Sequence, residues 1–236
     1  MELLTDLQSF LITGMNLESL FNMKLINFKL SGIALAIASM LIPAISYADI
    51  AATGDVIPGI PTTPNWNVPG ELVVGNTTDG TLTVSNGGVL TSGDAASLSS
   101  YIGKLAGSTG QVEVTGAGSR WTNDAVLMVG YQGDGTLRIL DGGVVETLTS
   151  VIHVGFDAGS KGYLEVSGAG SKLNSGHLLY IGGENNSDGR LIIADGGALT
   201  SVYDSYIANH SGSIGRVEVT GKDSVCFTGS VSLKYY

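Results

Sequence analysis

The segment Asp134-Gly-Thr-Leu-Arg-Ile-Leu-Asp-Gly-Gly143 decides the fold, because the chain repeats it at regular spacing. Two further copies begin at Asp79 and Asp188, which lie 134 − 79 = 55 and 188 − 134 = 54 residues away. A second motif falls between the copies: Gly110-Gln-Val-Glu-Val-Thr-Gly-Ala-Gly-Ser119, Gly162-Tyr-Leu-Glu-Val-Ser-Gly-Ala-Gly-Ser171 and Gly215-Arg-Val-Glu-Val-Thr-Gly-Lys-Asp-Ser224. The alternation of the two motifs defines units of roughly 25–30 residues, the sequence signature of a repeat architecture.

Both motifs alternate apolar and polar residues, which is the pattern of a β-strand with one buried face. The apolar pairs are Leu82/Val84, Val112/Val114, Leu137/Ile139, Leu164/Val166, Leu191/Ile193 and Val217/Val219. An earlier strand set is predicted at 72–75, 101–103, 127–130, 152–155, 179–182 and 206–208, and a third at 89–90, 121, 144–145, 173, 198–199 and 226–227. Each unit therefore predicts three short strands.

Three strands per unit, with Gly, Asp and Asn at the turns, describe one coil of a β-solenoid. One coil cannot bury its own inward side chains, whereas stacked coils share a continuous core. The sequence thus predicts an all-β fold, a parallel β-helix of about six coils with three short strands each. A β-propeller is disfavoured because the strands are short and only two tryptophans are present. A left-handed hexapeptide helix is disfavoured because no six-residue period occurs.

The composition is that of a folded, acidic chain. Charged residues make up 14% and hydrophobic residues 43% of the sequence, which is the opposite of a disordered composition. The formal net charge of −10, without a cluster of Lys or Arg, argues against a nucleic-acid partner. Cys226 is the only cysteine, so the fold must be stable without an intrachain disulfide.

The N-terminal part has the order of a secretion signal. Basic residues precede an apolar run over 30–42, which is shorter than the roughly 20 residues that span a bilayer. Small residues then precede the expected cleavage after Ala48. Residues 1–22 are either untranslated, with Met23 as the start, or an extension of the signal, and we favour the first. The predicted division is an upstream extension at 1–22, a signal peptide at 23–48, a Pro-rich entry segment or cap at 49–70, and the repeat domain at 71–236.

The repeats resemble the passenger repeats of type V autotransporters. The resemblance rests on Gly110-Gln-Val-Glu-Val-Thr-Gly-Ala-Gly-Ser-Arg-Trp121, on Leu127-Met-Val-Gly130 and on Gly133-Asp-Gly-Thr-Leu137. It covers about residues 70–236 and is more specific for the repeat type than for what the passenger does. It implies a right-handed parallel β-helix, export from a Gram-negative cell and a C-terminal translocator barrel.

No barrel sequence follows the repeats. The chain stops at Val231-Ser-Leu-Lys-Tyr-Tyr236, which reads as the start of another coil, whereas a barrel needs many alternating strands of about 10 residues. We therefore expect a fragment or the product of a truncated gene. A full-length form would reach the outer membrane and the cell surface, and this chain alone would stop in the periplasm.

No residue pattern predicts catalysis. Glu113, Glu165 and Glu218 share one repeat position, and paired carboxylates are what a polysaccharide-degrading β-helix would use. They follow the repeat, however, and Arg138 lies between the first two, which predicts a charge ladder on the outer face. The Asp-Gly pairs recur more than fifty residues apart and read as turn residues rather than as a calcium-binding roll.

The remaining reactive residue types carry no motif either. His153, His177 and His210 lack metal-ligand spacing, and no Gly-x-Ser-x-Gly stands in a strand–turn–helix context. Cys226 lies in an apolar stretch and is expected to be an inert, partly buried thiol. We expect no enzymatic activity, no catalytic residue, no cofactor and no metal ion.

One row of side chains is a candidate surface-binding ladder. It consists of Val73, Tyr101, Met128, His153, Tyr180 and Tyr206, which share one repeat position. If the flanking aliphatic residues point inward, this row lies outside the solenoid and could bind a host-surface receptor, a glycan or another passenger. The alternative is that the row only stabilises neighbouring coils. The expected function is a non-enzymatic structural or adhesive passenger segment; the alternatives are a polysaccharide-degrading enzyme and a non-functional fragment.

Overall fold

The computed structural model describes residues 48–233 except 60, 62, 94–98 and 185. The predicted upstream extension and all of the predicted signal peptide before Ala48 lie outside the described residues. In the described part the chain forms strands and turns, and no helix there is long and apolar enough to cross a membrane. All strands belong to one compact unit, Ser46–Tyr236.

The strands form three sheets, here called A, B and C, with seven, eight and seven strands. Sheet A contains β1 (Asp49–Gly54), β5 (Gly80–Ser85), β8 (Thr109–Thr115), β11 (Asp134–Leu140), β14 (Lys161–Ser167), β17 (Asp188–Ala194) and β20 (Ile214–Val219). Sheet B contains β2 (Val56–Ile57), β4 (Val73–Val74), β7 (Ser99–Ile102), β10 (Val126–Val129), β13 (Ile152–Val154), β16 (Leu179–Ile181), β19 (Ser205–Ile207) and β22 (Val231–Leu233). Sheet C contains β3 (Asn65–Val68), β6 (Val89–Ser92), β9 (Arg120–Asn123), β12 (Val144–Thr147), β15 (Lys172–Ser175), β18 (Ala198–Ser201) and β21 (Val225–Phe227).

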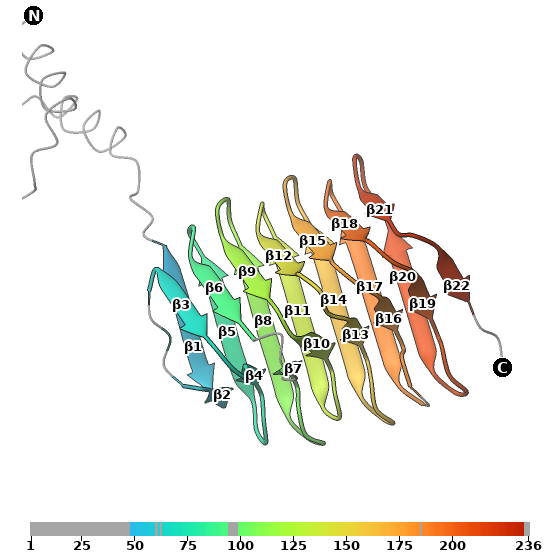
Figure 1. Ribbon diagram of the computed structural model, residues 1–236, viewed down its shortest axis with the longest axis horizontal. Coiled ribbons are helices and arrows are strands. Elements are labelled where there is room, and N and C mark those ends of the chain that lie inside the picture. Colours follow the sequence, from blue (N-terminus) through green and yellow to red (C-terminus); the bar gives the residue numbers. More distant parts are fainter. Residues whose placement is uncertain (1–47, 60, 62, 94–98, 185, 234–236) are drawn as a thin grey trace, which may run out of the picture. The chain divides into compact units, whose positions relative to one another are not determined.

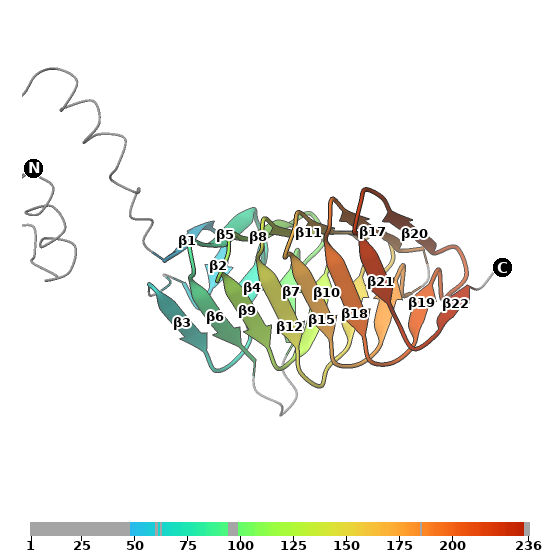
Figure 2. The ribbon, with the colours of Figure 1, turned by 90° about the horizontal axis from the view of Figure 1, so that it is seen from above.

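Each coil takes one strand from sheets B, A and C in that order, and successive coils stack side by side (Figures 1 and 2). From β4 to β22 every pairing is parallel, for example β8 with β11 and β11 with β14. The register places Leu82, Val112, Leu137, Leu164 and Leu191 in one line, and each is at most 1% exposed. The predicted parallel β-helix of about six coils is therefore confirmed, with the predicted aliphatic residues in its core.

The corner from sheet B to sheet A explains the glycine that stands second in the first motif and first in the second motif. Gly80, Gly110, Gly135, Gly162, Gly189 and Gly215 form one line through the stack. A Cβ atom on Gly110 would lie 2.1 Å from the carbonyl oxygen of Val74 and 2.4 Å from the backbone nitrogen of Gly103. Any side chain there would separate neighbouring coils, so only glycine fits.

The corner from sheet A to sheet C explains why two motifs alternate. In the first motif a left-handed residue precedes glycine, as at Asp141 (φ 50°) and Gly142 (φ 91°). In the second motif a serine hydroxyl accepts a hydrogen bond from that glycine in the preceding coil, with Gly142 N to Ser171 Oγ at 3.0 Å. Ser119 and Ser224 make the same contact with Gly87 and Gly196 at 3.0 and 3.1 Å. The coils are thus coupled in pairs, which gives the two-coil repeat.

The N-terminal end of the solenoid is covered. β1 pairs antiparallel with β5 and β2 pairs antiparallel with β4, so the first coil meets strands that run against it. The Asp55 carboxylate ties this cover to the next turn, because its Oδ2 accepts hydrogen bonds from the N–H groups of Thr77 and Thr78 at 2.8 and 3.1 Å. These backbone hydrogen bonds, the Thr77 bond first, lower the pKa of Asp55 below its ordinary value.

At the other end the last described coil has an open face. Val217 and Val219 hold the inward position of β20 as predicted, yet they are 37% and 47% exposed, because no described strand lies beyond β20. Phe227 in β21 is 62% exposed and Val231 in β22 is 55% exposed. Cys226, expected to be partly buried, is also exposed at this end. The pKa of its thiol is raised by desolvation, which disfavours the reactive thiolate.

Candidate functional site

The predicted surface-binding ladder is aligned by the parallel register. Val73, Tyr101, Met128, His153, Tyr180 and Tyr206 occupy matching positions in sheet B. The four ring-bearing residues are half-buried, with inward-facing neighbours such as Ile102 and Val129 at 1% and 0% exposure. Val73 and Met128 hold the same register position but are covered, with exposed fractions of 1% and 9%, and neither belongs to the hydrophobic core cluster. Both have neighbours on either side: Val73 lies between Ile57 and Tyr101, and Met128 between Tyr101 and His153.

Two further rings belong to the same surface. Tyr131 lies 5.2 Å from Tyr101 between ring centroids, and Phe156 lies 5.4 Å from Tyr131 and 4.7 Å from His153. His153 then stacks on Tyr180 at 4.8 Å, and Tyr180 stacks on Tyr206 at 5.0 Å. The six rings, here called the aromatic cluster, are Tyr101, Tyr131, His153, Phe156, Tyr180 and Tyr206. Each is half-buried, so the cluster both joins coils and reaches the surface.

The sequence analysis missed Tyr131 and Phe156. Each follows the glycine that ends a sheet B strand, so it stands outside the alternating pattern. Their backbone N–H groups continue the stack, with Tyr131 N donating to Gly103 O at 3.0 Å and Phe156 N to Gly130 O at 2.9 Å. The recurring glycine is the sequence feature that could have predicted them. It holds the same position in successive coils, so the residue that follows it is aligned between coils just as the preceding strand is.

His153 lies within the cluster as a neutral ring. Burial lowers its pKa from 6.5 to about 4, because desolvation disfavours the charged imidazolium. Its Nδ1 atom is buried and has no hydrogen-bond partner, and a Cβ atom on Gly183 would lie 3.1 Å from it. At neutral pH His153 therefore acts as an aromatic spacer rather than as an acid or base.

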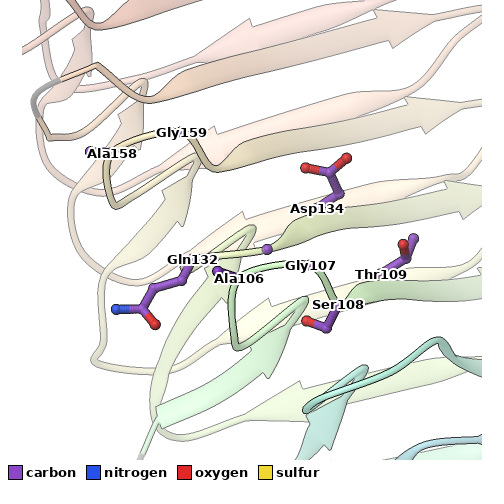
Figure 3. A pocket seen from close by; sticks show the side chains of 9 residues that line it. Ala106, Gly107, Ser108, Thr109, Gln132, Asp134, Ala158 and Gly159 are labelled. Carbon is purple, nitrogen blue, oxygen red and sulfur yellow. The ribbon is translucent and has the colours of Figure 1, made fainter.

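A surface hollow of about 310 Å³ lies at the corner from sheet B to sheet A (Figure 3). It is lined by Ala106, Gly107, Ser108, Thr109, Gln132, Gly133, Asp134, Ala158 and Gly159. These residues come from three successive coils. The middle coil contributes 132–134, which directly follow the ring of Tyr131.

The hollow arises from a difference in corner length. The chain has six residues between Gly103 and Gly110 (104–109) and six between Gly155 and Gly162 (156–161), but only four between Gly130 and Gly135 (131–134). The strands before and after these corners are in register. The short corner at 131–134 therefore leaves a gap between two longer ones.

The predicted charge ladder lies on sheet A. Arg138 Nε donates to Glu165 Oε2 at 2.9 Å, and an Arg138 Nη1 atom lies 4.0 Å from Glu113 Oε2. The Glu165 carboxylate also accepts a hydrogen bond from Tyr163 at 3.2 Å, and these contacts raise the pKa of Arg138, the hydrogen bond to Glu165 most. Glu218 meets Arg190 at 3.4 Å instead, because Ile192 holds the position between Glu165 and Glu218.

The other histidines do not join this surface. His177 lies against the ring of Tyr203 at 4.7 Å, and His210 lies 3.6 Å from Glu184. Within the described ranges no group of three His, Cys, Asp or Glu side chains is placed to hold a metal ion.

Comparison with known proteins gives one relative. The chain is 31% identical over 126 residues to the "Adhesin BmaC autotransporter" of Brucella suis biovar 1 (strain 1330). The match covers 49% of this chain and 4% of the adhesin, so the chain spans only a small part of that protein's length. No family model and no solved structure matches the chain.

Proposed function

Since the β-solenoid and this similarity fit an autotransporter passenger β-helix, we propose that the chain is an adhesive segment of such a passenger, exported to the cell surface. The solenoid presents side chains at fixed spacing along its length, and repeat folds use extended surfaces of this kind to bind partners. The single observation that carries the proposal is the match of 126 residues of the chain to an adhesin.

The aromatic cluster is the proposed contact surface. It includes four of the residues expected from the sequence, Tyr101, His153, Tyr180 and Tyr206, while Met128 holds the same register position and is buried. Half-buried rings offer a large contact area at little loss of conformational freedom, since their neighbours already fix them. A host-surface receptor, a glycan and a second passenger are the partner classes we propose.

The proposed role is non-enzymatic. In the rival reading, Glu113 and Glu165 would act on a polysaccharide as a carboxylate pair, which needs open space between them for the glycosidic bond and a water molecule. The Arg138 guanidinium takes that space and contacts both carboxylates.

The proposal is tested by coating beads with the full chain and measuring attachment to host epithelial cells. We expect attachment that Tyr180→Ala weakens and that the exposed Tyr203→Ala, which lies outside the cluster, leaves unchanged. Attachment no greater than that of uncoated beads would refute the adhesive role. Release of reducing ends from pectin, chitin or peptidoglycan by the chain would favour the enzyme instead.

A further inference from the structure

We propose that the hollow at the short corner binds a neutral saccharide, with Tyr131 and Phe156 as the ring surface beside it. This inference rests on the proposed adhesive function and adds the class of ligand and the place where it binds. Four features of the molecule support it: a short corner between two longer ones, the chemistry of the lining, the neighbouring rings and the local charge.

The first feature is the difference in corner length. The register of the strands around the short corner is undisturbed. The corner itself is two residues shorter than those on either side, 131–134 against 104–109 and 156–161. The resulting hollow of about 310 Å³ is of the size of small-molecule sites, which start at ~300 Å³.

The second feature is the lining. Two sides of the hollow are built from small residues on the longer corners, Ala106 with Gly107 and Ala158 with Gly159, all exposed. They allow a flat sugar ring to approach the backbone closely. Polar side chains stand along the short corner: Figure 3 places Gln132 and Asp134 at its two ends, with Thr109 near Asp134.

These polar groups suit sugar hydroxyls. The Asp134 carboxylate accepts hydrogen bonds from hydroxyl donors, and an amide such as Gln132 offers both donors and an acceptor. Gln132 is held in place, because its Nε2 donates to Asp157 Oδ2 at 3.0 Å. A carboxylate and an amide together match the alternating donors and acceptors of neighbouring hydroxyl groups on a sugar.

The third feature is the pair of rings. Tyr131 immediately precedes Gln132, and Phe156 lies two residues before Ala158, so both rings belong to the corners that line the hollow. They are 5.4 Å apart between centroids and inclined by 25°, which gives a nearly continuous aromatic surface. The C–H face of a sugar is apolar and packs on such a surface.

The fourth feature is the charge. Lys161 lies 3.6 Å from the Asp134 carboxylate, so this pair is close to neutral in sum. Asp157, on the neighbouring corner 156–161, adds a negative charge, and the formal net charge of the whole chain is −10. An anionic glycan would be repelled, whereas a neutral saccharide would bind without that penalty.

The test is a glycan array containing neutral and acidic glycans, probed with the full chain, followed by calorimetric titration of the best ligand. We expect binding to neutral glycans and an affinity lowered about tenfold by Asp134→Asn, since a hydrogen bond to a charged group contributes about that factor. Asp188→Asn is the matched control, because Asp188 holds the same repeat position two coils away, and it should bind like the natural chain.

Ala158→Leu supplies an independent variant, because it fills the hollow and removes no polar group. Ala158 and Asp134 are both exposed, so circular dichroism should be unchanged in each variant. Loss of binding in Ala158→Leu with retained β-structure supports the inference. Binding only to acidic glycans, no glycan binding, or equal binding by Asp134→Asn and Asp188→Asn overturns it.

Periodate treatment of host cells separates this inference from the adhesive function, because it destroys vicinal diols of sugars. If coated beads attach equally well to treated cells, the chain is adhesive and the saccharide inference is wrong. If the array shows binding of neutral glycans through Asp134 while beads do not attach to cells, the saccharide site stands and the adhesive function fails.

Discussion

The two described ends of the solenoid differ in how far their inward side chains are covered. At the N-terminal end the first coil is covered by β1 and β2, which run antiparallel to their neighbours. At the other described end β20, β21 and β22 repeat the regular coil, and Val219 and Phe227 are 47% and 62% exposed. The Val166 position, which matches Val219 two coils earlier, is 0% exposed.

This difference shows that the inward side chains of a coil are buried by the neighbouring coils and not by their own coil. Val166 and Val219 share residue type, motif and register, yet only Val166 has coils on both sides. The antiparallel cover interrupts the repeat at the edges of sheets A and B, which opposes edge-to-edge association there, whereas the edge of sheet C is β3, which pairs parallel with β6.

The largest effect concerns the middle of the solenoid and pH. The pKa of His153 is lowered to about 4 in the folded chain from 6.5, so the unfolded chain binds a proton first as pH falls. Stability from the neutral ring is complete above pH 6.5 and is lost between pH 6.5 and about 4, by up to about 3 kcal/mol. Urea unfolding across this range should show that loss, and His153→Phe should remove it. An unchanged pH dependence in the variant would contradict the buried, neutral ring.

The second prediction compares equal substitutions in the middle and at the open end. Val166→Ala removes two buried carbon groups between coils and should lower the free energy of unfolding by about 2 kcal/mol. Val219→Ala removes the same groups from a half-exposed site and should cost less than about 1 kcal/mol. Urea midpoints of the two variants measure the difference. Equal losses would mean that the open end is covered in solution.

The third prediction concerns the cover. Asp55→Ala removes the acceptor for the N–H groups of Thr77 and Thr78 and should destabilise the first coil by about 1 kcal/mol. Because the folded pKa of Asp55 is depressed, its contribution is complete above about pH 4 and is lost as pH falls through the folded value. Amide exchange in β1 should therefore quicken in the variant at pH 7. Exchange that stays slow would show that β1 is held without this carboxylate.

The smallest effect concerns the coupling of coils in pairs. Ser119→Ala leaves the N–H of Gly87 without its acceptor inside the stack and should cost about 1 kcal/mol. Ser224→Ala makes the same change against Gly196 at the open end, where water can replace the hydroxyl, and should cost close to nothing. Thermal midpoints of the two variants test this. A larger loss of stability in Ser224→Ala than in Ser119→Ala would contradict this expectation.

Much of the fold was predictable because its physics is local and repeated. Glycine spacing and the alternation around Leu137 and Leu164 specify corners, strands and the inward face. The antiparallel cover could not be predicted in this way, because residues 49–57 carry no repeat motif. Their pairing depends on a sheet edge that is formed by residues later in the chain. The surface row was predicted in register, but the burial of Met128 depends on how its neighbours' side chains pack. The hollow had a visible signal, the short corner at 131–134, which only a comparison of corner lengths uncovers.

The most direct test of the account is hydrogen exchange of the full chain, resolved by peptide segment. If burial comes from stacking between coils, exchange should be slow in β8, β11, β14 and β17. Exchange should also be slow in β5, which pairs with β1, and fast in β20 and β21. Uniform protection from β5 to β21, or exchange in β5 as fast as in β20, would contradict the claim that each coil is stabilised by its neighbours.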